Sequence, residues 1–278
     1  MRFAKVHGLG NDFVMVNGFR ETLPEDLGAL AKQVCDRHMG IGADGLIVIA
    51  PPLDPQTAAA RFLIFNDDGS QAQTCGNGLR CAAIFAKKEG IVDKNEFTLE
   101  TLGGPVLPAI LDEEKGIVRV DMGVPRFLPA EIPAKFNGTR VVGAPLMVQA
   151  RMYYVTLVSM GNPHCVIFVD DVDNFPVEKI GPQIERHDLF PEKTNAEFIQ
   201  LAGEDRIKMR VWECGCGETL ACGSGACAAT VASILNGYIK KHAQVILAKG
   251  SLDVEWADNS HVYMTGPACI VAEGEYFL

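Results

Sequence analysis

The sequence predicts an α/β protein built from two similar domains, and three observations support this prediction. The chain has 278 residues, which is enough for one large domain or for two of about 140 residues each. Apolar runs of strand length, each ended by turn residues, are its commonest pattern. A Cys-Gly-x-Gly motif occurs twice, at Cys75 and at Cys222, and each copy precedes an Ala-rich segment of helical length.

The first helix is expected after Pro24. Its apolar residues have helical spacing and are Leu27, Leu30, Ala31, Val34 and Cys35. Gly40 supplies the stop signal. Strands are expected where short apolar runs end in turn residues, over residues 45–52, 61–70, 96–104, 116–123, 154–163 and 165–172.

Two further helices are expected after the Cys-Gly-x-Gly motifs, at Leu79 to Lys88 and at Ala226 to Leu235. A glycine closes each one, Gly90 or Gly237, because glycine readily adopts the left-handed conformation that follows many helices. Strands therefore dominate the expected structure, and the helices are few.

The two motifs belong to a longer repeat. Aligning them on Cys75 and Cys222 places Asn66 and Glu213 nine residues upstream of their cysteines. A strand, a polar loop, Cys-Gly-x-Gly and an apolar helix thus occur twice, 147 positions apart. This spacing is much longer than the period of a solenoid repeat. It predicts two similar domains that divide near the Pro-rich stretch over residues 124–133.

Composition excludes several classes of partner. The net charge is −10, and no block of lysine or arginine could neutralise a row of phosphates, so we expect no nucleic acid. No apolar run approaches the length that crosses a bilayer, and no secretion signal follows Arg2, so we expect no membrane partner. Nine cysteines, most of them in apolar surroundings, suit reduced thiols in the cytoplasm better than disulfides.

The duplicated motif suggests a chemistry. A cysteine in the first turn of a helix faces unpaired N–H groups and the positive end of the helix dipole, which lowers its pKa. The same N–H groups bind carboxylates. Two such cysteines, brought together across a cleft between similar domains, would place a thiol on each face of a small carboxylate-bearing substrate. That arrangement predicts a racemase or epimerase that needs no cofactor.

Other interpretations stay open at this point. The segment CGCGETLAC holds three cysteines that could bind zinc, but the chain has no C-x2-C pair, and we expect no metal. GLGNDF, residues 8–13, could begin a dinucleotide site or form a loop with a substrate-facing Asn11. His164 follows a strand and a Gly-Asn-Pro turn, where exposure is expected, and it is either functional or structural.

The chain resembles the diaminopimelate epimerase family along nearly its whole length. The matching segments are HGLGNDF, RHMGIGADG, NDDGSQAQTCGNGLRC, SMGNPHCV, FPEKTNAEF and GETLACGSGAC. The resemblance implies two pseudo-symmetric α/β domains, each a mixed sheet or barrel wrapped around a central helix, with the active site in the cleft between them. The first would comprise residues 1–123 with a final strand, 264–278, that returns to it, and the second residues 124–263.

The resemblance also implies an activity. Members of this family interconvert the LL and meso forms of 2,6-diaminopimelate, in lysine and cell-wall synthesis, without pyridoxal phosphate or another cofactor. Carried onto this chain, Cys75 and Cys222 are the thiol and thiolate that exchange a proton with the α-carbon. The expected partner is therefore a small amino-acid substrate. The sequence leaves the oligomeric state open, although members of the family often form homodimers.

Further site residues follow from the same resemblance. Gly76, Asn77, Gly223 and Ser224 would offer helix-terminal N–H groups to the α-carboxylate. His164 and Glu213 would lie beside the reacting centre, where the carboxylate can bind the α-ammonium group. The substrate-binding asparagines, which mainly hold the unreactive end of the molecule, would be Asn11, Asn66, Asn162 and Asn195.

One position departs from the family pattern. The family normally has Glu-Arg-Gly where this chain has Glu213, Cys214 and Gly215, and that arginine grips the distal carboxylate. A neutral thiol offers no forked, charged donor. Either a nearby cation such as Arg210 or Arg206 compensates, or the chain is a related racemase for an amino acid without a distal carboxylate, histidine for example. A third hypothesis is a non-catalytic protein on the same fold that binds a small molecule or a metal.

Overall fold

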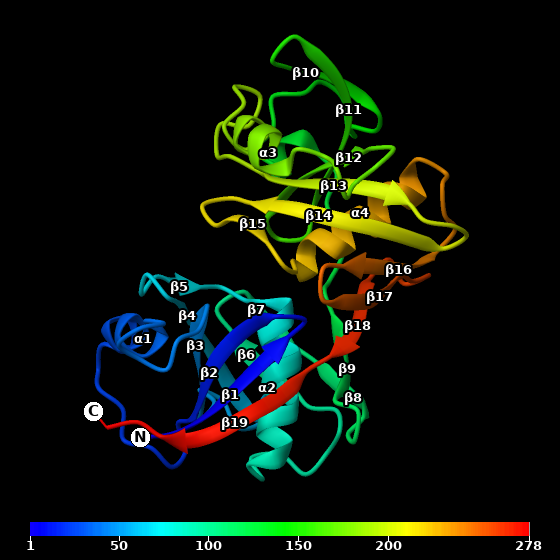
Figure 1. Ribbon diagram of the computed structural model, residues 1–278. Helices are drawn as coiled ribbons and strands as arrows, with labels where there is room; N and C mark the ends of the chain where they lie inside the picture. Colours follow the sequence, from blue (N-terminus) through cyan, green and yellow to red (C-terminus); the bar gives the residue numbers. More distant parts are fainter. Residues whose placement is uncertain (278) are drawn as a thin grey trace. The chain divides into compact units, whose positions relative to one another are not determined.

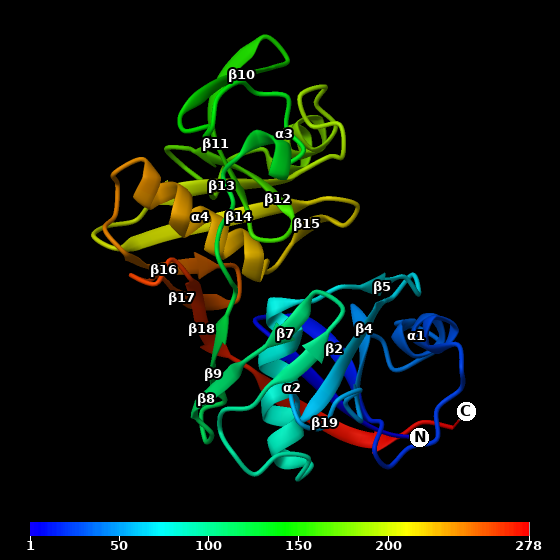
Figure 2. The same ribbon diagram turned by 180° about the vertical axis from the view of Figure 1, so that it is seen from behind.

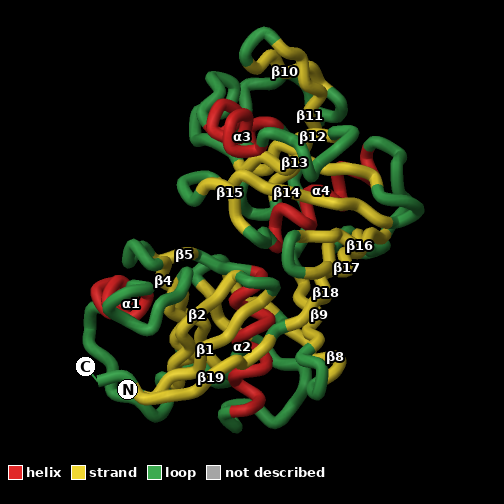
Figure 3. The backbone as a smooth tube through the Cα atoms, viewed as in Figure 1, coloured by secondary structure: helices red, strands yellow, loops and turns green. Residues whose placement is uncertain are grey.

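The computed structural model describes residues 1–277, which form two compact units. Unit 1 comprises Met1–Asp121 and Thr265–Leu278, and unit 2 comprises Met122–Met264. The domain boundaries expected at 123/124 and 263/264 lie within two residues of these positions; residue 278 of the expected final strand lies outside the described residues. Each unit is a mixed sheet with few helices, which confirms the predicted fold class (Figure 3).

Unit 1 contains a sheet of strand order β19-β1-β2-β3-β4-β6-β7, with β5 paired to β4. The β2–β3 and β4–β6 pairs are parallel and the other pairs are antiparallel. The strands are β1 (Arg2–Gly8), β2 (Asn11–Asn17), β3 (Gly45–Ala50), β4 (Ala60–Asn66), β5 (Gln71–Ala72), β6 (Leu99–Thr101), β7 (Gly104–Val106) and β19 (Cys269–Glu275). The last strand of the chain thus pairs with the first.

Two helices pack on this sheet. Helix α2 (Gly76–Lys88) contacts β1 to β4, β19 and the hairpin of β8 (Pro108–Asp112) and β9 (Ile117–Asp121), so strands surround it (Figures 1 and 2). Helix α1 (Leu27–Cys35) contacts β2, β3 and β4. Its buried residues are Leu30, Ala31, Val34 and Cys35, the face that the helical spacing predicts.

Unit 2 repeats the plan around α4 (Gly223–Leu235), which contacts β11 to β14, β16 and β17. Its strand order is β10-β11-β12-β13-β14-β16-β17-β18, with β15 paired to β14. The strands are β10 (Ala144–Val148), β11 (Arg151–Ser159), β12 (Pro163–Phe168), β13 (Asn195–Leu201), β14 (Arg206–Glu213), β15 (Gly217–Thr219), β16 (His242–Leu247), β17 (Gly250–Trp256) and β18 (Val262–Pro267). A short 3-10 helix, η1 (Pro129–Glu131), lies in the Pro-rich stretch.

The sequence reasoning missed helix α3 (Val177–Glu185), because Gly181 and Pro182 resemble helix breakers. The helix forms because Val177, Ile180 and Ile184 lie on one buried face. Gly181 allows close packing: a Cβ there would lie 2.5 Å from the Trp212 side chain. Tertiary packing therefore outweighs the local propensity.

The motif helices begin earlier than predicted. Helices α2 and α4 start at Gly76 and Gly223, three residues before the expected Leu79 and Ala226. Both end as expected, since Gly90 and Gly237 adopt positive φ of 67° and 75°. No helix within residues 1–277 is long and apolar enough to span a membrane.

Candidate active site

Cys75 and Cys222 occupy the same position in their two units, the N-cap of the central helix. Each has an extended backbone, and its sulfur accepts a hydrogen bond from the N–H three residues later. The Gly78 N–H lies 3.5 Å from Cys75 Sγ, and the Gly225 N–H lies 3.3 Å from Cys222 Sγ. The repeated motif thus encodes a sulfur held at the N-terminus of a helix. Each cysteine directly precedes the first turn of its helix, whereas the sequence placed it within that turn.

The second glycine of each motif leaves space that a side chain would fill. A Cβ at Gly78 would lie 2.9 Å from Ile47 Cδ1. A Cβ at Gly225 would lie 2.9 Å from Glu197 Oε1 and 3.2 Å from Cys222 Sγ. All three distances are shorter than ordinary van der Waals contacts, so a side chain at either glycine would force a neighbouring group to move.

In unit 1, Cys75 lies beside two of the expected residues. Its thiol faces Asn11 Oδ1 at 3.9 Å, and the same oxygen accepts a hydrogen bond from Asn77 Nδ2 at 3.1 Å. Asn11 is held in turn by Asp44, whose Oδ2 accepts from Asn11 Nδ2 at 2.8 Å. Asn66 instead donates to Ser70 Oγ at 2.9 Å, in the loop that precedes Cys75.

A buried arginine supports this half-site, and the sequence reasoning missed it. Arg80 is 0% exposed, and it donates to Asn77 Oδ1 at 2.9 Å, Gly76 O at 3.3 Å and Pro267 O at 3.3 Å. Its charge polarises the amide that contacts Asn11. The signal was an arginine within an otherwise apolar helix, where a charge is rarely buried without partners.

The Gly-Leu-Gly segment that precedes Asn11 is the turn of a hairpin. Leu9 and Gly10 adopt positive φ of 57° and 89°, and Gly8 pairs with Asn11 across strands β1 and β2. A strand follows the turn, where a dinucleotide site needs a helix. The dinucleotide interpretation is therefore wrong, and the loop presents Asn11 to the Cys75 half-site.

In unit 2, Cys222 is buried against Glu213, Ser224 and the Gly225 N–H. Ser224 Oγ lies 3.5 Å from its sulfur. Burial raises the pKa of the Cys222 thiol well above its ordinary value, and the charges of Glu213 and Glu197 raise it further. The bonds from Ser224 and Gly225 act in the opposite direction and are outweighed. The prediction of a lowered pKa is thus wrong for this cysteine, which carries a protonated thiol near neutral pH.

Glu213 is the last residue of β14 and lies beside Cys222. Burial raises the pKa of its carboxyl, and hydrogen bonds from Thr219 and from the Cys222 thiol lower it in part. The Thr219 hydroxyl bonds directly to Glu213 Oε1. The Glu213 carboxylate therefore lies beside the Cys222 sulfur.

His164 is fully buried, and the expectation that it is exposed is wrong. It lies within β12, directly after the turn, and its Nδ1 lies 2.7 Å from Glu197 Oε1. Its Nε2 lies 3.0 Å from Asn162 Oδ1. Glu197 is also 0% exposed. The sequence reasoning missed this carboxylate, although a glutamate inside the apolar strand NAEFIQL was a signal that a partner lies nearby.

Asn195 fixes the turn that carries Cys214. Its Oδ1 accepts from the Cys214 N–H at 2.8 Å, and its Nδ2 donates to Pro163 O at 3.0 Å. The side chain thereby connects the starts of β12 and β13 to the turn after β14.

Cys214 and Cys216 are exposed in this turn, whereas Cys222 is buried at α4. In residues 1–277, no three His, Cys, Asp or Glu side chains lie together as a metal site.

Neither arginine suggested as a substitute at position 214 is available. Arg210 forms two bonds to Glu218, at 2.6 and 2.9 Å, and its Nη1 bonds to three backbone carbonyls. Arg206 begins β14 while Glu213 ends it, so the two residues are separated by roughly 23 Å of extended chain. Neither Arg210 nor Arg206 is therefore placed to compensate for Cys214, and the expected nearby cation would have to be another residue.

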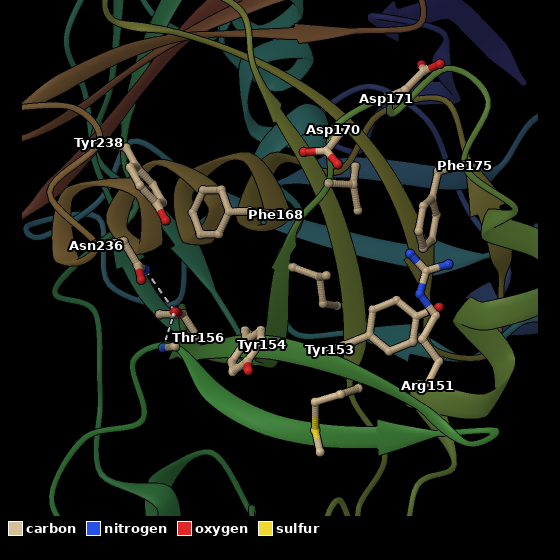
Figure 4. Close-up of a pocket in the computed structure, with 14 residues that line it drawn as sticks. Arg151, Tyr153, Tyr154, Thr156, Phe168, Asp170, Asp171, Phe175, Asn236 and Tyr238 are labelled. Carbon is tan, nitrogen blue, oxygen red and sulfur yellow. Dashed lines mark hydrogen bonds between the residues drawn. The ribbon is translucent and has the colours of Figure 1, made fainter.

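Unit 2 has a separate pocket of about 560 Å³ (Figure 4). The rings of Tyr153, Phe168 and Phe175 line it, and Asn236 Nδ2 donates to Thr156 Oγ1 at 2.9 Å at its edge. None of the predicted site residues lines this pocket.

Comparisons with known proteins agree with this geometry. A family model described as diaminopimelate epimerase matches residues 3–128 and 156–271. Proteins named diaminopimelate epimerase from Pelotomaculum thermopropionicum and Moorella thermoacetica are 50% and 48% identical, and each alignment covers 99% of both chains. A hydroxyproline epimerase from Agrobacterium vitis shares the fold, with a TM-score of 0.69 at 17% identity over 99% of this chain and 90% of that one. A phenazine biosynthesis protein of the PhzF family from Bacillus anthracis does so with a TM-score of 0.72 at 17% identity, over 100% and 99%.

Proposed function

Because the chain belongs to the diaminopimelate epimerase family, we propose that it interconverts LL- and meso-2,6-diaminopimelate by a two-base proton transfer without a cofactor. One cysteine removes the α-proton and the other returns a proton to the opposite face of the same carbon. The observation that carries this proposal is the identical placement of Cys75 and Cys222 at the N-caps of two central helices.

The helix N-termini support the chemistry that such a transfer requires. Losing the α-proton leaves negative charge that spreads onto the α-carboxylate. The N–H groups of Gly76, Asn77, Gly223 and Ser224 lie in the first turns of α2 and α4, where backbone donors and the helix dipole favour an anion. They would bind that carboxylate and lower the barrier to proton removal.

The protonation of Cys222 suggests its part in the reaction. Burial, Glu213 and Glu197 keep this sulfur as a thiol, so it would act as the acid in one direction while Cys75 acts as the base. A C–H bond breaks as an S–H bond forms at Cys75, and the S–H bond of Cys222 breaks as a new C–H bond forms. The reverse direction exchanges the two roles.

Glu213 would hold the α-ammonium group of the substrate. A half-buried carboxylate next to the acid thiol can pair with a cation that approaches the same carbon. His164, fixed between Glu197 and Asn162, would support the same side of the site. We propose that the reaction takes place in the cytoplasm, since Cys35, Cys81 and Cys165 are buried thiols.

A racemase for an amino acid without a distal carboxylate is the second candidate, and Cys214 is the observation that favours it. Deuterium incorporation at Cα tests both, with LL-diaminopimelate, L-histidine, L-lysine and L-glutamate offered to the reduced protein. We expect a preference for diaminopimelate, and loss of its epimerisation by at least about 1,000-fold in Cys75→Ala and in Cys222→Ala. Preference for an amino acid without a distal carboxylate would show that the protein is the racemase of the second candidate function. A protein that exchanges none of the four would be a binding protein.

A further inference from the structure

Diaminopimelate carries a second carboxylate at its unreactive end, and a buried anion needs a charged or polar partner. The Cys214 turn offers only a neutral thiol at this position, and Arg210 is committed to Glu218 and to backbone carbonyls. Another cation near the Cys214 turn would therefore decide whether this substrate is bound.

Lys193 is such a cation. It lies two residues before Asn195, whose side chain holds the Cys214 N–H at 2.8 Å. Its charge acts on the Cys214 thiol: burial and Glu185 raise the pKa of that thiol, whereas Lys193 and, more weakly, Arg186 lower it. Its side chain is 50% exposed, so the ammonium group is open to a ligand from solvent.

A buried carboxylate fixes the position of this ammonium group. Glu185, only 2% exposed, has its Oε1 3.4 Å from Lys193 Nζ. Its Oε2 accepts from Trp212 Nε1 at 2.7 Å, while Oε1 has no hydrogen bond. Lys193 also has a positive φ of 65°, which is rare for a lysine. The ion pair with Glu185 thus holds the Lys193 side chain, whose ammonium group carries three donors.

We propose that Lys193 binds the distal carboxylate of the substrate, with Glu185 as the positioning residue that holds its ammonium group beside the Cys214 turn. This inference rests on the proposed function and names the residue that selects a substrate with two carboxylates.

L-Lysine is a matched probe, because it is diaminopimelate without the distal carboxylate. In Lys193→Met we expect the KM for LL-diaminopimelate to rise roughly 10- to 100-fold, the range for losing one charge-assisted bond. We expect kcat to change by less than about 3-fold, since the residue does not touch the reacting carbon. Deuterium exchange into L-lysine should be unchanged.

Three variants sharpen the result. Lys193→Arg should keep the KM within about 5-fold of the parent, because the charge remains. Adding Cys214→Arg to Lys193→Met should recover about 10-fold in KM by supplying a new cation. Lys208→Met, which removes a lysine paired with Asp173 elsewhere on unit 2, is the control and should match the parent.

An unchanged KM for LL-diaminopimelate in Lys193→Met, in a parent that epimerises it, would overturn the inference and leave the proposed function intact. An equal loss on diaminopimelate and L-lysine would also overturn it, because the effect would then not concern the distal carboxylate. A parent that exchanges no α-proton of diaminopimelate would instead refute the proposed function.

Discussion

Removing the charge of Glu197 should make Cys222 more reactive. The distance between the Glu197 carboxylate and the Cys222 sulfur follows from their distances to Gly225. A Cβ built on Gly225 lies 2.9 Å from Glu197 Oε1 and 3.2 Å from Cys222 Sγ. The oxygen and the sulfur are therefore no more than about 6 Å apart. At an effective dielectric constant of about 20, that distance corresponds to roughly 3 kcal/mol between two unit charges. The carboxylate opposes the thiolate, so Glu197→Gln should lower the pKa of Cys222.

The assay is alkylation of Cys222 by iodoacetamide at pH 7, followed by mass spectrometry of the peptide that contains it. The thiolate population should rise in Glu197→Gln, but a thiolate of lower pKa is also a weaker nucleophile. We therefore expect the alkylation rate to increase by about 3- to 10-fold. Glutamine keeps an oxygen that can accept from His164 Nδ1, so the buried pair retains its hydrogen bond.

Glu204→Gln is the matched control, because Glu204 is an exposed glutamate of the same unit. It should leave the alkylation of Cys222 unchanged. A rate in Glu197→Gln equal to or below that of the parent would refute the conclusion that buried carboxylates keep Cys222 protonated.

Three further predictions concern the surroundings of the two cysteines. Arg80→Met should lower the free energy of unfolding in urea by about 2–4 kcal/mol, because three acceptors lose a charged donor; a cost equal to that of exposed Arg20→Met would contradict this. Gly225→Ala should reduce kcat by at least about 10-fold, since its Cβ would displace Glu197 or Cys222, and an unchanged kcat would show that the space is not needed. Burial raises the pKa of the Glu185 carboxyl, but the hydrogen bond from Trp212 and the nearby charge of Lys193 together outweigh burial and lower that pKa in the folded protein. The stability that this carboxylate contributes is present above its ordinary pKa of 4.5 and is lost as the pH falls below that value. The Tm of Glu185→Gln should therefore approach that of the parent as the pH falls below 4.5. A difference in Tm that grows in this range would contradict the prediction.

The parts of the fold that follow from local pattern could be predicted from the sequence. The buried face of α1, the glycines that end α2 and α4, and the repeat centred on the two cysteines all depend on short-range spacing. Helix α3 could not be predicted, because its Gly-Pro pair is a local signal for a break, whereas the burial of Val177, Ile180 and Ile184 and the close approach of Gly181 to Trp212 depend on distant parts of the chain.

The site residues divide in the same way. The motifs predicted both cysteines, Asn11, Asn77 and Glu213 as site residues, and the structure brings Asn11 and Asn77 to Cys75 and Glu213 to Cys222. Arg80, Glu197 and Lys193 were not expected from the sequence, since they contact partners on other elements. The predicted direction of the Cys222 pKa shift was wrong for the same reason. The helix N-terminus is visible in the sequence, but the burial of the thiol and its proximity to Glu197 are not.

The fate of solvent deuterium in the first turnovers shows whether two different cysteines serve one α-carbon. LL-Diaminopimelate is incubated with the reduced protein in D2O, and product and recovered substrate are analysed at low conversion. Two bases predict deuterium at Cα of the meso product and almost none in the recovered LL substrate, because the proton is returned from the other face. Equal deuterium in both, or retained protium in the product, would indicate a single base and contradict the account.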